Sequence, residues 1–384
     1  MEIKTGSYER RGGKFGLLGR HLGHSLSPEI HSLLGEYEYR LYEVEPEDLA
    51  SFINSADLDG FNVTIPYKET VLPLCRDLTP RARAVGSVNT MKRLPGGGFI
   101  GDNTDYEGFS LLLDKVWDKE PLSGSDVLVL GSGGASKAVC AVLRDRGARV
   151  QIVSRTGSLN YKNVCESVPG CRLIVNTTPV GMFPDEGRSP IDLSPFKSLS
   201  AVIDIIYNPE KTALLLQAES LGLRTGGGMT MLIAQAGAAG FSESEPNIVL
   251  IGMPGAGKTS FGKMLAEALG RNFFDTDEEI EKKTGMSIPE IFRIKGEEEF
   301  RKTETGVLAG LTRKESLVIA TGGGIVTRPE NRKYLEKSRV IHIKRPIKDL
   351  PVSGRPLSEA VGVEKLWEER KPLYEDWADV EILL

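Results

Sequence analysis

The sequence lacks the marks of several protein classes. Its cysteines form no CxxC pair, so neither a zinc site nor a disulfide framework is indicated, and we expect reduced thiols at Cys75, Cys140, Cys165 and Cys171. No apolar run reaches transmembrane length, and the N-terminal stretch MEIKTGSYERRGGKFG has no apolar signal-peptide core. The net charge of −5 gives no reason to expect a nucleic-acid or membrane partner. These absences predict a cytoplasmic protein. Basic residues that bind anions are expected to do so as individually placed side chains rather than as a basic surface patch.

Length and composition predict several ordinary globular domains. The chain has 384 residues, which suggests roughly two to three domains, and its 40% hydrophobic content is normal for such proteins. The best linker candidate is SESEP at Ser242–Pro246, after which the apolar pattern resumes at Ile248. We therefore expect a linker over residues 242–247. No internal repeat is evident.

Two glycine-rich turns carry the strongest functional signal. GSGGAS at Gly131–Ser136 follows the apolar run Val127–Leu130, and GMPGAGKT at Gly252–Thr259 follows Ile248–Ile251. A strand, a glycine turn and a helix start present backbone N–H groups and a helix N-terminus to an anion. Only the second turn adds a lysine and a hydroxyl suited to a triphosphate and its metal. The chain is therefore predicted to hold a dinucleotide site and a separate nucleoside triphosphate site.

The segment before the first glycine turn alternates short apolar runs with helical stretches. This alternation predicts an α/β fold with a mostly parallel sheet and crossover helices. The expected strands are 13–18, 40–44 and 60–65, and the expected helices are 28–34 and 46–54. Further on we expect strands at 127–130, 150–153, 173–176 and 201–206, and helices at 105–116, 137–146, 211–221 and 229–239.

The residues after the strand Val150–Val153 indicate which dinucleotide is bound. NAD sites usually place an acidic residue there for the ribose hydroxyls, but this chain has Ser154, Arg155 and Thr156. A guanidinium between two hydroxyls suits a 2′-phosphate, since arginine offers bidentate, charge-assisted donors. A solvated surface arginine is the alternative. The pattern favours NADP.

Four motifs before the first glycine turn gather polar groups suited to a small polyhydroxy carboxylate. They are HSLSP (24–28), NVTIPYK (62–68), GSVNT (86–90) and GDNTD (101–105), which offer Ser25, Ser27, Thr64, Lys68, Asn89 and Asp105. A lysine beside a carboxylate can supply a proton and positive charge to an alkoxide formed by hydride transfer. A surface salt bridge is the alternative for such a pair. His24 and His31 are further acid–base candidates, though we expect them to be structural.

With NTTPVGM, DIIYNP and MLIAQA downstream, residues 14–241 resemble shikimate dehydrogenase. The resemblance implies a substrate-binding domain over 1–104, completed by 228–241, and a Rossmann NADP-binding domain over 105–227. It implies reversible reduction of 3-dehydroshikimate to shikimate by NADPH, with Lys68 and Asp105 as the catalytic pair. The implied substrate contacts are Ser25, Ser27, Thr64, Asn89, Tyr207 and Gln235, with the serines holding the carboxylate. The implied cofactor contacts are Gly131, Gly133, Gly134, Ala135, Ser154, Arg155, Thr156 and Gly228.

The second half of the chain carries a P-loop motif, GMPGAGKT at 252–259, and further motifs that follow it. Lys258 is expected to span the β- and γ-phosphates and Thr259 to ligate Mg²⁺. The next strand ends in FFDTD, whose carboxylates Asp275 and Asp277 are two apart and so lie on one side. Further motifs are GEEEFR (296–301) with Glu304, ATGGG (320–324), SGRPL (353–357) and RKPLY (370–374).

Residues 247–380 resemble shikimate kinase on these motifs. The resemblance implies a P-loop domain with a parallel sheet over 248–384, and ATP-dependent phosphorylation of shikimate to shikimate 3-phosphate. It assigns catalysis to Lys258, Asp277 and a lid residue, Arg355, and shikimate binding to Asp277, Arg301, Gly322, Gly323, Gly324 and Arg370. Glu304 would orient Arg301, and Thr259 and Asp275 would hold Mg²⁺. The implied ATP contacts are Gly252, Gly255, Ala256, Gly257, Lys258, Thr259 and Ser260.

The chain also departs from both family patterns, which leaves alternatives open. Only twenty residues (156–175) separate Arg155 from Asn176, so a helix and a strand of the cofactor sheet are expected to be shortened. The lid segment 347–355 is short, and the usual C-terminal helix is missing. One alternative is an active dehydrogenase with a non-catalytic, ATP- or shikimate-binding regulatory module. Another alternative keeps the folds but changes the substrates. The first half would then be a quinate/shikimate dehydrogenase that uses NAD, or the second half a related P-loop kinase of another small metabolite. Oligomeric assembly stays open.

Overall fold

The structure is a computed structural model that describes residues 3–5 (backbone only), 13–23, 25–35, 37–117, 121–241, 245–350 and 362–383. The chain divides into two compact units. The dinucleotide unit comprises Gly13–Pro28 and Glu38–Phe241, and the P-loop unit comprises Met1–Gly12, Glu29–Tyr37 and Ser242–Leu384. The expected boundaries at residues 104, 227 and 247 stay predictions. Within the described residues, no helix is long and apolar enough to cross a membrane.

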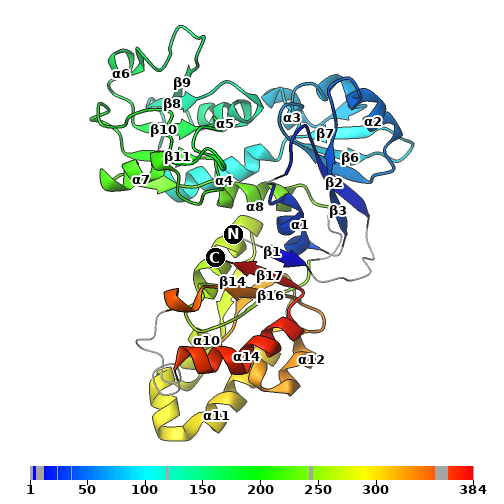
Figure 1. Ribbon diagram of the computed structural model, residues 1–384, viewed down its shortest axis with the longest axis vertical. Helices are drawn as coiled ribbons and strands as arrows, with labels where there is room; N and C mark the ends of the chain where they lie inside the picture. Colours follow the sequence, from blue (N-terminus) through cyan, green and yellow to red (C-terminus); the bar gives the residue numbers. More distant parts are fainter. Residues whose placement is uncertain are drawn as a thin grey trace. The chain divides into compact units, whose positions relative to one another are not determined.

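The first part of the dinucleotide unit contains a mixed sheet of order β3-β2-β4-β6-β7-β5 (Figure 1). Its strands are β2 (Lys14–Gly19), β3 (Glu38–Glu43), β4 (Gly60–Val63), β5 (Asp77–Leu78), β6 (Thr90–Arg93) and β7 (Phe99–Asp102). The expected parallel pairing holds for β2 with β3, β2 with β4 and β5 with β7, whereas β6 runs antiparallel to both β4 and β7. The β6–β7 pair follows from the tight turn at Gly96–Gly98, where three glycines adopt positive φ and reverse the chain.

Short helices accompany this sheet, namely α2 (Leu49–Ser55), η1 (Leu72–Leu74) and α3 (Pro80–Val85). Helix α1 (Ser27–Leu34) begins in this unit, and its residues from Glu29 onward belong to the P-loop unit. Thr79 caps α3 because its hydroxyl accepts from the backbone N–H of Ala82. The core under the sheet is built from buried Leu18, Phe61, Val63, Met91 and Phe99.

The second part of the dinucleotide unit is a wholly parallel sheet of order β12-β11-β10-β8-β9. Its strands are β8 (Asp126–Leu130), β9 (Arg149–Val153), β10 (Leu173–Asn176), β11 (Ala201–Asp204) and β12 (Arg224–Gly226). Its helices are α4 (Asp105–Trp117), α5 (Gly134–Asp145), α6 (Val164–Ser167), α7 (Ala213–Ser220) and α8 (Met229–Ala238). One apolar cluster covers each face, with Val127 and Val129 in one and Leu128 and Leu130 in the other.

The crossover between β9 and β10 is as short as the sequence suggests. It contains only α6, which has four residues, and the chain then enters β10 directly. As a result β9 is the edge strand of this sheet. The dinucleotide fold is therefore present in a reduced form.

The P-loop unit is built on a sheet of order β1-β17-β16-β13-β15-β14. Its strands are β1 (Ile3–Thr5), β13 (Ile248–Ile251), β14 (Asn272–Asp275), β15 (Leu317–Ala320), β16 (Arg339–Lys344) and β17 (Val380–Leu383). All neighbours are parallel except β1, which pairs antiparallel with β17, Lys4 lying opposite Glu381 (Figure 1). Pairing of the chain's N-terminal strand with this sheet was not expected from the sequence.

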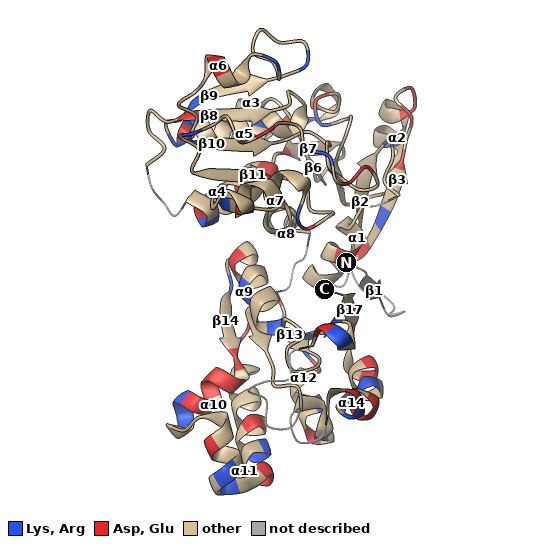
Figure 2. Cartoon of the chain, turned by 60° about the vertical axis from the view of Figure 1, so that its left-hand side comes forward, with Lys and Arg blue, Asp and Glu red and all other residues tan. Residues whose placement is uncertain are grey.

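Helices α9 (Lys258–Leu269), α10 (Thr276–Thr284), α11 (Ile288–Leu311), α12 (Arg332–Leu335) and α14 (Val363–Trp377) belong to this unit, with the 3-10 turns η2 (Ile325–Thr327), η3 (Pro329–Asn331) and η4 (Ile347–Asp349). A capping box of Ser287 and Glu290 starts α11, and a non-helical Gly296 kinks it. Many residues of α10 and α11 are charged, as the red and blue stretches of their ribbons show (Figure 2). On α10, Glu278 and 281–283 are exposed, as expected for a solvated helix face.

Candidate active sites

The polar motifs of the first sheet meet at one edge because β2 and β4 are parallel neighbours. The backbone N–H of Thr64, after β4, donates to the carbonyl of Leu18 in β2 at 2.9 Å. The loop after β2 carries Ser25 and Ser27, whose hydroxyl oxygens lie 3.1 Å apart. The Ser25 hydroxyl also accepts from the backbone N–H of Ser27 at 3.2 Å, which fixes the pair at the start of α1.

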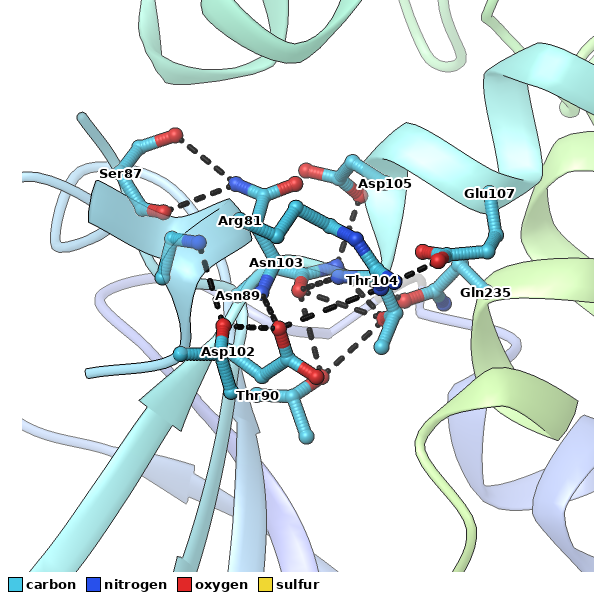
Figure 3. Close-up of polar contacts among 12 residues, drawn as sticks. Arg81, Ser87, Asn89, Thr90, Asp102, Asn103, Thr104, Asp105, Glu107 and Gln235 are labelled. Carbon is cyan, nitrogen blue, oxygen red and sulfur yellow. Dashed lines mark hydrogen bonds and ion pairs between the residues drawn. The ribbon is translucent and has the colours of Figure 1, made fainter. Parts of the chain in front are cut away.

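Lys68 and Asp105 form a sequestered ion pair at the same edge. The Lys68 Nζ donates to Asp105 Oδ2 at 2.5 Å, and Asp105 is only 4% exposed. Asp105 is the first residue of α4, where the helix N-terminus favours a carboxylate. Its other oxygen accepts from Asn89 Nδ2 at 2.9 Å, and the same amide nitrogen lies 3.2 Å from Gln235 Oε1 on α8 (Figure 3). Four residues from distant segments are thus joined in one network.

The orientation of the Asn89 amide is set by its surroundings. The backbone N–H of Thr104, which can only donate, bonds to Asn89 Oδ1 at 2.7 Å. Asn89 Nδ2 must therefore face Asp105 and Gln235 (Figure 3). Buried Asn103 supports this loop by donating to the carbonyl and hydroxyl of Ser87, both at 2.9 Å. We did not predict Thr104 or Asn103 as positioning residues, although both lie in the GDNTD motif.

The first glycine turn is shaped for close approach. Gly131 has φ 103°, and a Cβ there would lie 2.9 Å from Thr178 Cγ2. A Cβ on Gly134 would lie 3.0 Å from the Cβ of Lys68, so the turn adjoins the stem of that lysine. At Gly133 nothing lies within 4 Å of such a Cβ, which leaves room for a ligand. Gly228 begins α8, where a Cβ would collide with the carbonyl of Ile205.

The residues after β9 fit the phosphate end of a dinucleotide. Arg155 and Thr156 are exposed and Ser154 is half-buried, so their polar groups are accessible. Together with the open turn before α5, they offer a helix N-terminus and a guanidinium to an NADP molecule. Tyr207 is half-buried and follows β11, and its contact with a substrate stays a prediction.

The P-loop after β13 has the backbone that its glycines allow. Gly252, Gly255 and Gly257 have φ values of 140°, 80° and 98°. The Lys258 Nζ donates to the carbonyls of Gly252 and Met253, each at 2.8 Å, which holds its ammonium within the loop. The Thr259 hydroxyl lies 2.7 Å from Asp275 Oδ2, and both are hard oxygen donors of the kind that would hold a Mg²⁺ ion.

A cavity of about 630 Å³ joins the P-loop to the predicted acceptor residues. Asp277 lies in its wall, and Oδ1 of this carboxylate has no hydrogen-bond partner among the described residues. Burial, followed by the charges of Asp275 and Glu304, raises the pKa of Asp277 from 3.8 to about 7. A carboxylate that titrates near neutrality is suited to accept a proton from a hydroxyl group.

Arg301 is fixed beside this carboxylate. Its Nη1 donates to Glu304 Oε2 at 2.8 Å, and neither side chain is appreciably exposed. Burial raises the pKa of Glu304, whereas the adjacent guanidinium opposes this shift. A Cβ on Gly324 would collide with the Arg301 guanidinium, so the glycine turn and the arginine are in direct contact.

The acceptor turn at Gly322–Gly324 is held from several elements. The backbone N–H of Gly322 donates to the buried Thr276 hydroxyl at 2.9 Å. The carbonyl of Gly323 accepts from Arg370 Nη1 at 3.0 Å and from the Tyr374 hydroxyl at 2.5 Å. We did not predict Thr276 or Tyr374 as positioning residues. The signal was present in the sequence, because Thr276 belongs to the motif FFDTD and Tyr374 to the motif RKPLY.

Other predicted residues lie outside this network. Arg355, His24 and residues 242–244 of the expected linker fall outside the described residues. His31 is 1% exposed and its Nδ1 lies 2.6 Å from the Tyr37 hydroxyl, which agrees with the expected structural role. Arg345 lines the kinase-like cavity and was not predicted to do so.

Comparison with known proteins identifies both halves. Residues 17–91 match the family model described as "Shikimate dehydrogenase substrate binding domain", and residues 254–383 match "Shikimate kinase". The chain is 39% identical over 252 residues to an NADP(+) shikimate dehydrogenase of Methylobacterium radiotolerans, covering 57% of this chain and 87% of that protein. It is 34% identical over 262 residues to the Bacillus subtilis enzyme, covering 61% and 93%.

Solved structures resemble the dinucleotide half. Shikimate dehydrogenase of Thermus thermophilus in complex with NADP(H) and shikimate matches with a TM-score of 0.52 and 32% identity, covering 59% of this chain and 91% of that one. Quinate dehydrogenase of Corynebacterium glutamicum in complex with NAD matches with a TM-score of 0.53 and 26% identity, covering 59% and 92%.

The fold and the two sites define a two-site enzyme, with a dinucleotide-dependent oxidoreductase and a P-loop phosphotransferase in one chain. The chain belongs to the shikimate dehydrogenase family and carries a shikimate kinase domain after it. It is a bifunctional shikimate-pathway enzyme that uses NADP(H) and ATP. The expected fold class and both expected activities are confirmed.

Proposed function

We propose that Lys68 and Asp105 carry out the reduction of 3-dehydroshikimate to shikimate. NADPH supplies the hydride when bound. The Lys68 ammonium would give its proton to the developing alkoxide, and Asp105 would hold that ammonium in place. Support comes from the 2.5 Å ion pair and from Asn89, which bonds the other oxygen of Asp105. Ser25 and Ser27 would bind the substrate carboxylate, with Thr64, Asn89, Tyr207 and Gln235 at the ring hydroxyls.

In the kinase half, we assign the role of base to Asp277. ATP supplies the transferred phosphoryl group when bound. Asp277 would accept the proton of the shikimate hydroxyl, while Arg301, Arg370 and the turn Gly322–Gly324 position the acceptor. Lys258 and the lid residue Arg355 would offset charge on the phosphates, and Thr259 and Asp275 would hold Mg²⁺. The observation that carries this assignment is the Asp277 carboxylate, which lies in the same cavity as Lys258 and whose Oδ1 has no hydrogen-bond partner among the described residues.

The two reactions then run in sequence, because the product of the first is the acceptor of the second. A cytoplasmic location and the domain limits 1–104, 105–227 and 248–384 are further parts of this proposal. NADP is favoured over NAD because Arg155, rather than an acidic residue, follows β9. Shikimate is favoured over quinate by the NADP(+) shikimate dehydrogenases that the chain resembles at 34–39% identity.

Product analysis with 3-dehydroshikimate, NADPH and Mg·ATP tests the assignment. Wild-type protein should consume NADPH and form shikimate 3-phosphate. Lys68→Ala should abolish NADPH oxidation but still phosphorylate added shikimate, and Lys258→Ala should do the reverse. Lys162→Ala and Lys337→Ala, at exposed positions in the respective halves, serve as matched controls. If the wild type accumulated shikimate without phosphorylating it, the kinase half would be a binding module instead.

A further inference from the structure

The cavity of the P-loop unit is lined by the carboxyl ends of four parallel strands that lie in the order β14, β15, β13 and β16. The residues that follow these strands line it in the same order: Asp275 and Asp277, then Gly322–Gly324, then the P-loop, then Arg345. A ligand bound outside the carboxyl ends of these strands would meet these groups in the same order. The acceptor lies at the β14 and β15 end, and phosphates lie at β13.

Arg345 is thus on the side of the P-loop that is opposite to Asp277. A Cβ on Gly252, the first P-loop glycine, would collide with the carbonyl of Ile343, so the end of β16 packs against the loop backbone. Arg345 is two residues beyond that contact. Arg345 therefore enters the lining of the cavity from the β16 side, next to the P-loop.

The residues before Arg345 show why its side chain is free to serve the cavity. His342 Nδ1 and Lys344 Nζ both contact the carboxylate of Glu381 on β17, each at 3.2 Å. These two side chains lie on one side of β16, as residues two apart do in a strand. Arg345 leaves the strand next, is exposed, and pairs with no acidic side chain in the described part of the chain.

The other cations of this cavity are already engaged. Arg301 is paired with Glu304 at 2.8 Å, Arg370 donates to Gly323, and Lys258 donates to two loop carbonyls. The acceptor end also carries the carboxylates Asp277 and Glu304, whereas Arg345 forms no ion pair with a carboxylate among the residues described. A triphosphate would therefore find in Arg345 a cation that no neighbouring carboxylate neutralises.

We propose that Arg345 is a nucleotide-binding residue that contacts the phosphates of the bound nucleoside triphosphate from the β16 side of the P-loop. This inference rests on the kinase activity and extends it by one residue. Arginine suits this position because its planar fork can bond two phosphate oxygens at once. Because Arg345 follows a strand of the central sheet, its backbone is positioned before the nucleotide binds.

The experiment compares full-length Arg345→Ala and Arg345→Lys with wild type. Lys337→Ala is the matched control, because Lys337 is an exposed cation of the same unit that does not line the cavity. The measurements are the Kd for Mg·AMP-PNP without acceptor, and the KM values for ATP and for shikimate. The rate of NADPH oxidation by the same chain reports whether the protein preparations are equivalent.

Arg345→Ala should raise the Kd for AMP-PNP and the KM for ATP by about tenfold, which is the loss of one charge-assisted contact. The values for Arg345→Lys should lie between those of Arg345→Ala and wild type. The shikimate KM of each variant, and all values for Lys337→Ala, should stay within about twofold of wild type. An unchanged AMP-PNP Kd, or a rise in the shikimate KM alone, would overturn the proposal. If wild-type protein failed to phosphorylate shikimate, the assigned kinase activity would fail, and the AMP-PNP measurement would still decide the role of Arg345.

Discussion

The hydroxyl of Tyr374 donates to the carbonyl of Gly323 at 2.5 Å, which links α14 to the glycine turn that follows β15. The same hydroxyl lies 3.9 Å from the sulfur of Met253 in the P-loop. Tyr374 is fully buried, and burial raises its pKa to about 12, so the hydroxyl remains a donor across the physiological range. One side chain therefore contacts both the acceptor turn and the nucleotide loop.

Tyr374→Phe should weaken acceptor binding. It removes one of the two donors to Gly323 and leaves Arg370 as the other, a loss of about 1 kcal/mol. We expect the KM for shikimate to rise about fivefold to tenfold, with the KM for ATP within about twofold of wild type. Steady-state kinetics checks this, with Tyr334→Phe as the control at a half-buried tyrosine of the same unit. Equal changes in both KM values would argue for a general structural role.

Arg155→Ala should change cofactor preference. The variant loses charge-assisted bonds to the 2′-phosphate, which are worth roughly 1.5–3 kcal/mol. The KM for NADPH should rise by about 10- to 100-fold, whereas the low activity with NADH should not fall. Arg144→Ala, at an exposed position on α5, is the control. A parallel loss with both cofactors would contradict a role in recognising the phosphate.

Asp277 should give kinase activity an acid limb. Because its pKa is raised to about 7 and the proposed role needs the ionised form, kcat/KM for shikimate should fall as pH drops below about 7. The decline should approach tenfold per pH unit. NADPH oxidation by the same chain gives the comparison profile. An acid limb centred near pH 4 would contradict the raised pKa of Asp277.

The same shift has an opposite consequence for stability. The folded state holds the Asp277 proton up to about pH 7, whereas the unfolded state releases it near 3.8, so stability is lost as pH rises through this window. Asp277→Asn should therefore stabilise the P-loop unit at pH 8 by on the order of 2–4 kcal/mol, and little at pH 4. Chemical unfolding at both pH values measures this. Glu278→Gln, at an exposed position on the same helix, should show no such difference.

His342 should make the P-loop unit sensitive to acid. Burial lowers the pKa of His342 to about 4, although the Glu381 carboxylate opposes this shift. The positive charges of Lys344 and Lys258 also disfavour the protonated imidazole. The ring of Tyr374 stacks on that of His342. The unfolded chain binds a proton near 6.5 and the folded chain does not, so stability falls as pH decreases from 6.5 to 4.

His342→Phe, which keeps a ring against Tyr374, should flatten this dependence by up to about 3 kcal/mol. Urea unfolding between pH 4 and 7, followed by fluorescence of Trp367 and Trp377, measures it. His21→Gln, at an exposed histidine, is the control. A variant with the wild-type slope would show that another group causes the acid sensitivity.

Local sequence patterns anticipated most elements and the chemistry of both sites. The strands at both glycine turns lie as expected, because buried apolar runs followed by glycine turns have few other solutions. The pair of Lys68 and Asp105 was expected from two motifs. In contrast, the antiparallel placing of β6 was missed, because a short strand does not encode its partner.

The sequence by itself determined which chemical groups are available: two glycine turns, the lysines and carboxylates beside them, and the arginine that favours NADP. Only the tertiary structure decided which of these groups meet. Thr276 and Tyr374 hold one glycine turn although they are 98 residues apart, and Arg345 joins the cavity because β16 pairs with the P-loop strand. Such contacts depend on strand order and burial, which arise from packing across the whole unit rather than from neighbouring residues.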